Sequence, residues 1–566
     1  MDQFAERERL QKKAQQMIQE RDKTWLPKYK DLRDNISPND GQFEGDMKND
    51  GQRRDYRINN PKPLVSSGRL AAGMSSGLTS KSRPWFELQA PEGVPNNSNV
   101  ARWLYVVQEA IRSTLAKSNL YNILPQVYHS QGVYGIAAMS ALPDAQDVVR
   151  FTHYPCGTYA IDTNDKGQVD TFLRQYSMTP RRMAQRFGIN SLCPETKAAA
   201  ERGDNQLVCI NHLVEPNADS DINKVDAMSM PYRSTYWESG KNDARTVLRQ
   251  GGFKTFPIMA PRWLVNGDNI YGTGPGDIAL GKCRELQLLE RDKMRLVQHL
   301  SNPNRTAPIS LKGLGAASIV PGGITWVPDT LTGVAMQPTY TPPPASIQNV
   351  RQEILECEQD IAEIFYEDLF MMITQSTGQM TAYEIARRQE EKMAMLGPVV
   401  ERNDDELLDP LIDQVFSILY EQSMPRWMGL LPGEPLIPPP PEELQGVALR
   451  VEYISILAQA QKASSTGSIE RAAQFTGMLM QTGFPEAGDK FNADAAQDAY
   501  YNNVGAPPTI LRSADEVAAI REGRAQQIQQ QQAMEQGAAL VEGAKTLAET
   551  PTGGDTALSA IASAMQ

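Results

Sequence analysis

DIALGKCRELQLLERDKMRLVQHL (residues 277–300) and IQNVRQEILECEQDIAEI (residues 347–364) are the stretches that decide the fold, because both have the composition and period of long helices. The first predicts a helix over 277–300 with Asp277 as its N-cap. The second predicts a helix over 347–370 with Ser346 as its N-cap. Two long helices this close together in the chain predict a helical hairpin.

The second helix carries a narrow apolar seam. Its apolar residues recur at alternating spacings of three and four, which is the heptad pattern of a coiled-coil seam and is narrower than the stripe of an ordinary core helix. The seam consists of Ile347, Val350, Ile354, Cys357, Ile361 and Ile364. The remainder of this helix is acidic apart from Arg351, whereas the first helix is slightly basic. The plainest interpretation is an antiparallel hairpin with solvated charge.

A proline- and glycine-rich insert at 303–345 separates the two helices. It contains the short β-like pieces APISL, ASIV and ITWV, and Pro342-Pro343-Pro344 closes it. Residues 371–382, after the second helix, carry no charge and predict a loop.

The sequence that precedes the hairpin predicts both helices and strands. Residues 1–35 predict one charged amphipathic helix with a turn near Pro27, and residues 37–63 predict a linker or an extended arm. A further helix is predicted at 99–118. Alternating stretches predict strands at 169–176, 207–214 and 244–250.

The C-terminal side is helical in pattern. A run from 383 to 422 contains Pro398 and Pro410, each of which should kink or break a helix. A proline-rich connector at 425–446 leads to further helical sequence, and a Gln- and Ala-rich tail follows Ser513. The fold class predicted from the whole pattern is α+β, mostly helical.

Composition narrows the possible functions. The chain has 566 residues, 40% of them hydrophobic, which allows a sizeable core and several domains. It has no apolar run of eighteen residues, so no membrane insertion is expected, and its charged N-terminus does not resemble a secretion signal. Five widely spaced cysteines favour reduced thiols over a disulfide framework. The net charge of −12 is not that of a protein that grips DNA tightly over its whole surface.

No catalytic residue, metal ligand or cofactor site is predicted. The sequence lacks a phosphate-binding GxxxxGK[ST] loop, an HExxH motif, a GxSxG motif and a CxxC pair. The GTGPGD segment at 272–277 is better explained as a tight turn that leads into a capped helix than as a phosphate cradle. The acids Asp404, Asp405 and Glu406 are expected to lie on a solvated helix face, because adjacent helical residues point apart.

Four blocks of sequence resemble the portal (head-to-tail connecting) proteins of short-tailed bacteriophages. They are LAAGMSSGLTSKSRPWFE at 70–87, FPIMAPRWLVNGDNIYGTGPGD at 256–277, MTAYEI at 380–385 and VGAPPTILRSADEVAAIR at 504–521. The blocks occur in the order found in the family and span about residues 70 to 520. No distinctive resemblance covers residues 1–60 or the tail after 525.

The resemblance implies a portal fold with wing, stem, clip and crown regions, assembled as a twelve-subunit ring around a central channel. Its regions would be the N-terminal helix and arm 1–63, the wing 64–276, the stem helices 277–302 and 346–370, the clip 303–345, the tunnel loop 371–382, the kinked wing helix and helical region 383–500, and the crown and tail 501–566. The seam would then pack between neighbouring subunits. The DNA-facing residues of the tunnel loop would be Thr374, Gln375, Ser376, Thr377, Gly378 and Gln379.

The resemblance also implies partners and a location. The protein would be made in the host bacterial cytoplasm and would act at the portal vertex of the virion capsid. Its partners would be other copies of itself, the large terminase, tail adaptor and nozzle proteins, major capsid and scaffold proteins, internal core or ejection proteins, and double-stranded DNA that passes without sequence preference.

Two other classes of protein compete with this interpretation. A scaffold or internal ejection protein should be helical nearly throughout and should lack a β-rich insert between two seam helices. A packaging ATPase should contain a phosphate loop, which this sequence lacks.

Overall fold

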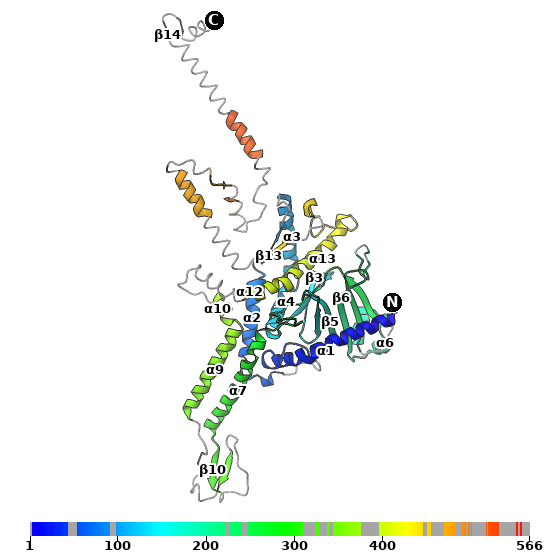
Figure 1. The fold of residues 1–566 in the computed structure, drawn as a ribbon, viewed down its shortest axis with the longest axis vertical. Helices are drawn as coiled ribbons and strands as arrows, with labels where there is room; N and C mark the ends of the chain where they lie inside the picture. The colour runs from blue at the N-terminus through cyan, green and yellow to red at the C-terminus, as the bar shows by residue number, and fades with distance from the viewer. Residues whose placement is uncertain are drawn as a thin grey trace. The chain divides into compact units, whose positions relative to one another are not determined.

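The computed structural model describes the chain in segments. They are residues 3–43, 54–90, 98–221, 224, 226–239, 247–308, 323–327, 337–338, 343–374, 396–444, 450–453, 469–480 and 519–530, with 482, 490–493, 496–497, 500, 517, 551–552 and 555–556. These segments form a mixed α+β structure that is mostly helical (Figure 1). The chain divides into two compact units: residues 1–87, 107–439 and 451–460 form one, and residues 88–106, 440–450 and 461–566 form the other.

The first helix, α1 (Gln3–Asn35), agrees with the predicted range 1–35 but has no turn at its proline. The predicted turn near Pro27 is wrong, because Pro27 lies inside the helix. Leu26, Tyr29 and Leu32 around it are buried, so packing outweighs the backbone hydrogen bond that a proline removes. Residues 36–43 then continue without regular structure, and a short 3-10 helix follows at Asp55–Arg57.

Three helices follow: α2 (Lys62–Leu78), α3 (Ser98–Lys117) and α4 (Leu120–Tyr134), and α3 confirms the helix predicted at 99–118. Helix α2 packs closely on α4, and a Cβ atom at Gly132 would lie 2.6 Å from a methyl group of Leu70. Helix α4 ends at Gly135, whose φ of 76° lies in the left-handed region that glycine tolerates best.

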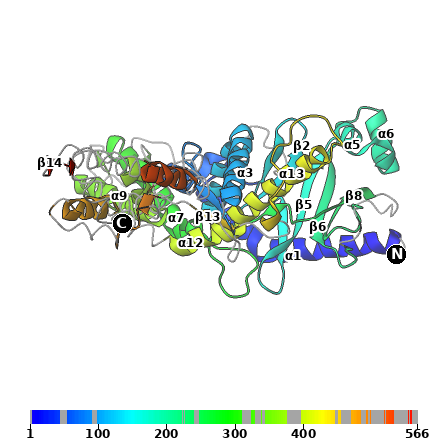
Figure 2. The ribbon, with the colours of Figure 1, turned by 90° about the horizontal axis from the view of Figure 1, so that it is seen from above.

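A five-stranded antiparallel sheet forms the largest β structure of the first unit. Its strands, in the order β4-β5-β6-β7-β8, are Tyr159–Thr163, Val169–Met178, Val208–Pro216, Tyr232–Glu238 and Val247–Phe253. They confirm the three strands predicted near 169, 207 and 244. Helix α1 covers one face, where Leu10 and Met17 pack against Leu173 and Trp237. Helices α5 (Pro180–Phe187) and α6 (Pro194–Glu201) lie on the other face, with a 3-10 turn at Ile189–Ser191 between them (Figure 2).

A second sheet, of three strands in the order β3-β2-β9, packs beside it. These strands are β2 (Ala138–Asp144), β3 (Val148–Tyr154) and β9 (Ile258–Met259), all antiparallel. Strand β1 (Phe86–Gln89) lies earlier in the chain.

The helical hairpin predicted from the sequence is present. Its helices are α7 (Pro275–Ser301) and α9 (Pro344–Ile364), and they lie side by side in Figure 1. The described part of the insert forms β10 (Arg305–Pro308), β11 (Ile324–Val327) and β12 (Gln337–Pro338). Strand β10 pairs with β11 in parallel and with β12 in antiparallel orientation.

Both predicted N-caps of the hairpin need correction. Helix α7 starts two residues earlier than Asp277, which lies in the first turn and accepts a 2.9 Å hydrogen bond from the Gly274 backbone N–H. Helix α9 starts at Pro344, and Ser346 lies inside its first turn. In both cases a proline takes the first helical position, where its missing N–H costs nothing.

The second helix is also interrupted. It stops at Ile364, Tyr366 has a φ of 55°, and a separate helix α10 spans Glu367–Thr374. A helix therefore occupies the first four residues of the loop predicted at 371–382.

The C-terminal helices begin at the two prolines. Helix α12 (Gly397–Asn403) has Pro398 in its first turn, and α13 (Asp409–Trp427) has Pro410 in its own. A π-helical turn at Asp404–Leu408 joins them, so the chain remains helical past Pro410. Short elements follow at Glu442–Leu444, β13 (Arg450–Tyr453), β14 (Pro551–Thr552) and β15 (Asp555–Thr556), and residues 469–480 and 521–530 are helical. Within the described residues, no helix is long and apolar enough to span a membrane.

Candidate functional site: the helical hairpin and its root

The seam of α9 packs against α7 of the same chain. Ile354, Cys357 and Ile361 are buried, and the Cys357 thiol donates a 3.3 Å hydrogen bond to the backbone oxygen of Lys282. Cys283 is buried in the same hairpin, and burial raises its pKa to about 12, which keeps it a neutral thiol. The heptad spacing is therefore accounted for by packing inside one hairpin.

The remaining seam residues lie at the two ends of the helix. Ile347, Val350 and Ile364 are half-buried in the single chain. Ile347 and Val350 belong to the end of α9 that adjoins the β insert, and their packing between subunits stays a prediction.

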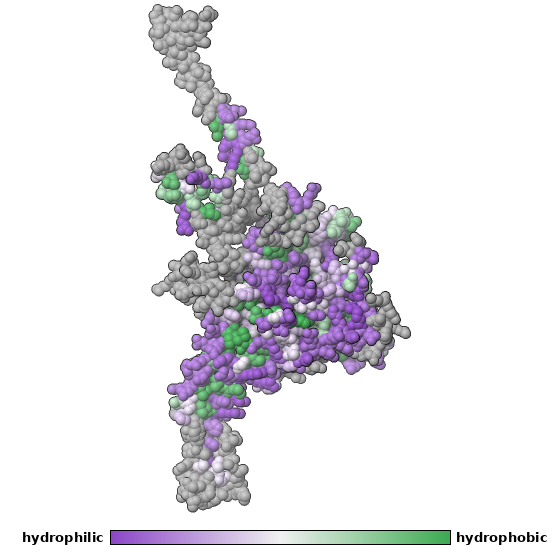
Figure 3. Space-filling view, in the orientation of Figure 1, coloured by the Kyte–Doolittle hydropathy of each residue, from purple (hydrophilic) through white to green (hydrophobic). Residues whose placement is uncertain are grey.

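Charge pairs within the chain accompany the seam. Lys282 Nζ of α7 lies 3.0 Å from an Asp360 carboxylate oxygen of α9, so the basic and acidic helices complement each other inside one chain. Arg284 of α7 lies 3.0 Å from Asp31 at the end of α1. The pairs are about half exposed, so they orient the helices more than they stabilise them. The visible surface of the hairpin mixes hydrophilic and apolar residues (Figure 3).

Two asparagines, Asn59 and Asn60, clamp the hairpin, and their role was not predicted from the sequence. The side-chain oxygen of Gln287 on α7 accepts hydrogen bonds from the backbone N–H groups of Asn59 (2.6 Å) and Asn60 (2.9 Å). The Asn60 amide donates to Glu290 of α7 at 3.1 Å and to Glu358 of α9 at 2.7 Å. One buried side chain thus ties both helices to a segment that was predicted as a linker or arm.

A buried carboxylate fixes the point where α9 stops. Glu367, 3% exposed, accepts hydrogen bonds from Lys62 Nζ at 2.9 Å and Ser66 Oγ at 2.7 Å, and it also pairs with Arg69. All three partners lie on α2. These contacts hold the chain at the left-handed residue Tyr366 and set the direction of α10.

The residues predicted to face DNA, 374–379, lie at the C-terminal end of α10 and directly after it in the chain. Thr374 is the last residue of α10. Gln375, Ser376, Thr377, Gly378 and Gln379 lie outside the described residues.

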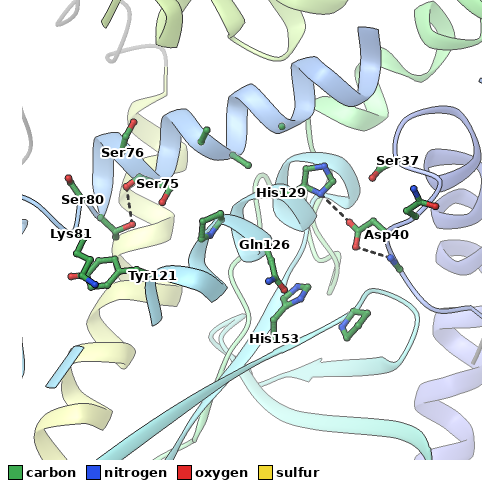
Figure 4. Close-up of a pocket in the computed structure, with 18 of the residues that line it drawn as sticks. Ser37, Asp40, Ser75, Ser76, Ser80, Lys81, Tyr121, Gln126, His129 and His153 are labelled. Carbon is green, nitrogen blue, oxygen red and sulfur yellow. Dashed lines mark hydrogen bonds and ion pairs between the residues drawn. The ribbon is translucent and has the colours of Figure 1, made fainter. Parts of the chain in front are cut away.

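A pocket of about 880 Å³ with a mixed apolar and polar lining lies between α2, α4 and residues 37–42 (Figure 4). Its walls include Ala71, Ala72, Ser75, Ser76, Thr79, Ser80 and Lys81, all from the first block of family-like sequence. Asp40 and His129 form an ion pair across it at 3.2 Å. Burial acts to raise the pKa of Asp40, but the hydrogen bond and charge of His129 hold it below its ordinary value.

The same pocket contains a serine–histidine–aspartate line that is not a catalytic triad. His129 Nε2 lies 3.3 Å from Ser67 Oγ, on the far side of the ring from Asp40. Ser67 is 1% exposed, however, and its hydroxyl donates to the Leu64 backbone oxygen at 3.0 Å. A nucleophile must reach its substrate, so this serine is structural.

The acidic turn at 404–406 is the predicted solvated face only in part: Asp405 is exposed, whereas Asp404 and Glu406 are half-buried. Glu406 pairs with Arg262 at 2.6 Å, and Arg262 is 3% exposed. Burial, together with the charges of Asp409 and Asp405, raises the pKa of Asp404 to about 7. Across the described residues, no three His, Cys, Asp or Glu side chains are grouped to hold a metal ion.

Comparison with known proteins identifies the family. Residues 7–511 match the model of the bacteriophage head to tail connecting protein family. The chain is 40% identical over 567 residues to the portal protein of Salmonella phage epsilon15, covering 99% of this chain and 98% of the relative. It is 36% identical over 530 residues to a probable portal protein of Bordetella phage BPP-1, covering 93% and 92%.

Solved structures provide more distant matches. A chain from the virion of a native gene transfer agent particle matches with a TM-score of 0.32 and 10% identity, over 74% of this chain and 87% of that one. A chain from the neck of an empty gene transfer agent particle gives 0.33 and 11%, over 74% and 88%. Likenesses this weak carry no structural argument.

The match over most of the chain defines a structural component of the phage particle and not an enzyme. The protein belongs to the bacteriophage head to tail connecting (portal) protein family.

Proposed function

We propose that this chain is the subunit of a portal ring at one capsid vertex, through which double-stranded DNA is packaged and later ejected. The observation that carries the proposal is the similarity, over nearly the full length, to two phage portal proteins. A ring of twelve subunits around a central channel is the arrangement that we expect.

We assign the regions of the chain to the parts of such a ring as follows. Helices α7 and α9 would form the stem, and the β insert at 303–345 between them would form the clip. The mixed α+β region 64–276 would form the wing, residues 371–382 the tunnel loop, residues 383–500 the kinked wing helix and the region leading to the crown, and residues 501–566 the crown and tail. The clip would bind the large terminase during packaging and the tail adaptor proteins afterwards. Capsid, scaffold, nozzle and internal core proteins would contact the other regions.

The charge of the chain favours a channel through which DNA slides, and disfavours a surface that binds DNA tightly. The net charge is −12, and the tunnel-loop residues 374–379 are polar and uncharged. Such side chains can exchange hydrogen bonds with phosphates without the strong, salt-dependent attraction that lysine or arginine creates.

The described structure disfavours the alternative of a scaffold or internal ejection protein. Those proteins are expected to be helical nearly throughout, whereas this chain has a five-stranded sheet in its first unit and a three-stranded sheet between α7 and α9.

Negative-stain imaging and mass photometry of the purified chain test the proposal. We expect closed rings with a central hole and a mass near twelve times 62.7 kDa. A chain that stays monomeric at every concentration and salt would contradict it. Deletion of residues 309–340, within the clip, should leave rings that form but fail to bind terminase.

A further inference from the structure

A row of side chains crosses four strands of the five-stranded sheet. Arg174 of β5 pairs with His212 of β6, His212 pairs with Tyr236 of β7, and Tyr236 pairs with Arg249 of β8. Directly paired residues on neighbouring antiparallel strands point to the same side of a sheet. The row therefore lies on the face that also carries α5 and α6, opposite α1.

Aromatic stacking accompanies the row at Arg174, at the His212–Tyr236 pair and at Arg186 of α5. The His212 and Tyr236 rings are parallel at 3.8 Å, and the Arg174 guanidinium lies over the rings of Tyr154 (4.6 Å) and Tyr176 (4.4 Å). Arg186 reaches over from α5 to within 5.6 Å of the Tyr236 ring. The rings thus hold these guanidinium groups in fixed positions.

These positive charges are not neutralised locally. Within the described residues, Arg174, Arg186 and Arg249 have no acidic partner, and the buried Nε of Arg174 makes no hydrogen bond. Arginines elsewhere, such as Arg233 with Glu6 and Arg262 with Glu406, pair closely. Burial and the charges of Arg174 and Arg186 lower the pKa of His212 to about 3, so the histidine adds no charge of its own.

Stacking alone would explain Arg174 but not the whole cluster. Arg249 is exposed at the end of the row, and α5 adds the exposed Arg181 and Arg182 beside Arg186. Like charges repel, so a cluster that has no acidic partner among the described residues is a cost to the isolated chain that an anionic partner would remove.

We propose that this basic row, defined by Arg174, Arg186 and Arg249, is a contact surface for carboxylates of a second copy of the chain in the ring. The inference rests on the proposed ring-forming function and names one of its contacts. Arginine is among the side chains enriched at protein–protein contacts, and the exposed Ile189 next to α5 adds apolar surface beside the row. The chain as a whole is acidic, so a neighbouring copy has carboxylates to offer.

Ring geometry agrees with this assignment. A closed ring uses head-to-tail contacts, in which two unlike surfaces of the same chain meet. A basic surface on an acidic protein satisfies that requirement, because it cannot pair with itself. Planar guanidinium groups held by stacking would bind carboxylates in a fixed orientation and so set the angle between neighbours.

The test is ring formation by the full-length double variant Arg186→Glu, Arg249→Glu, measured by mass photometry over a concentration and salt series. Both side chains are exposed, so the variant should fold with an unchanged circular dichroism spectrum. We expect the concentration for half-assembly to rise at least tenfold. Lys166→Glu with Lys117→Glu, the same charge change at two exposed lysines outside the row, is the matched control and should assemble like the wild type.

The half-buried Arg174 is tested by two further variants. Arg174→Gln should weaken assembly, and Arg174→Lys should restore it in part, since lysine keeps the charge and loses the planar fork. Rings of wild-type stability in the double variant and in Arg174→Gln would overturn the contact.

Two other results of these experiments can be distinguished from the loss of a subunit contact. If the double variant assembles normally but loses affinity for a 30-base-pair duplex, the row binds nucleic acid and the proposal is overturned. If the wild type and the control also form no rings, the proposed ring-forming function is contradicted, and with it this contact.

Discussion

At the residue scale, Glu367 combines burial with charge. It is 3% exposed and has two cationic partners on α2, Lys62 and Arg69. We expect Glu367→Gln to lower the free energy of unfolding by about 1–3 kcal/mol, because it removes the buried charge that accepts a hydrogen bond from Ser66 and pairs with two partly exposed cations. Chemical denaturation of the monomer measures this.

The matched control is Glu363→Gln, an exposed carboxylate one turn earlier on the same hairpin. It should change stability by less than about 0.5 kcal/mol. Equal losses for the two variants would show that the contacts with α2 do not hold the end of α9.

Asp404 gives a prediction about pH. Its pKa is raised to about 7 from an ordinary value near 4, so the folded protein favours the neutral acid. That contribution to stability is complete below about pH 4 and is lost as the pH rises through about 7. Asp404→Asn keeps a neutral side chain at every pH. We therefore expect the melting temperature of the wild type to fall relative to this variant as the pH rises from about 5 to 7, between the two pKa values, and to change little above that.

Scanning fluorimetry from pH 5 to 8 measures this difference. Asp165→Asn, which removes an exposed acid from a turn in the sheet, should follow the wild type throughout. Parallel pH profiles for wild type and Asp404→Asn would mean that Asp404 titrates like a solvated carboxylate.

At the element scale, the seam of α9 first holds its own hairpin together. Ile354 and Ile361 are buried against α7 in the single chain. Replacing both with Asp puts unpaired charge into that contact, so the isolated monomer should lose several kcal/mol of stability and rings should be lost as well. Monomer unfolding and gel filtration of the double variant measure the two effects separately.

A milder pair of substitutions serves as the control. Ile354→Val with Ile361→Val should cost about 0.5–1.5 kcal/mol each and leave rings intact. If the Asp variant forms no rings while its monomer is as stable as the wild type, the seam acts between subunits and not within the hairpin.

Sequence reasoning located the elements better than their ends. The hairpin, the strands near 169, 207 and 244 and the helix at 99–118 follow from periodicity, which reports a buried face. The turn at Pro27, the two caps and the unbroken helix to 370 were wrong, because packing, terminal prolines and the contacts of Glu367 decide them. The clamp by Asn60 was not predictable, since its partners lie more than 200 residues away.

At the scale of the whole molecule, the remaining prediction concerns the passage of DNA. Replacing Gln375 and Gln379 with Lys should add a ring of positive charge to the channel of the proposed portal. Packaging and ejection should slow while rings still assemble, and the defect should lessen as salt rises, because added ions compete for phosphates. Ejection kinetics of variant particles over a salt series measure this.

The neutral pair Gln375→Asn, Gln379→Asn is the control and should behave like the wild type. Lysine-bearing particles that package and eject at wild-type rates at every salt would show that residues 374–379 do not meet DNA.

The Asn60 clamp has a mechanical consequence. Beyond Gln287, where the clamp contacts it, helix α7 continues for 14 residues, from 288 to Ser301, so at 1.5 Å per residue a rigid arm about 21 Å long extends past the clamp. A rotation of about 10° at the clamp would displace the far tip by about 3.7 Å, which is close to the rise of one residue in a strand. Because Asn60 contacts both helices of the hairpin, we expect the two arms to swing together about this point.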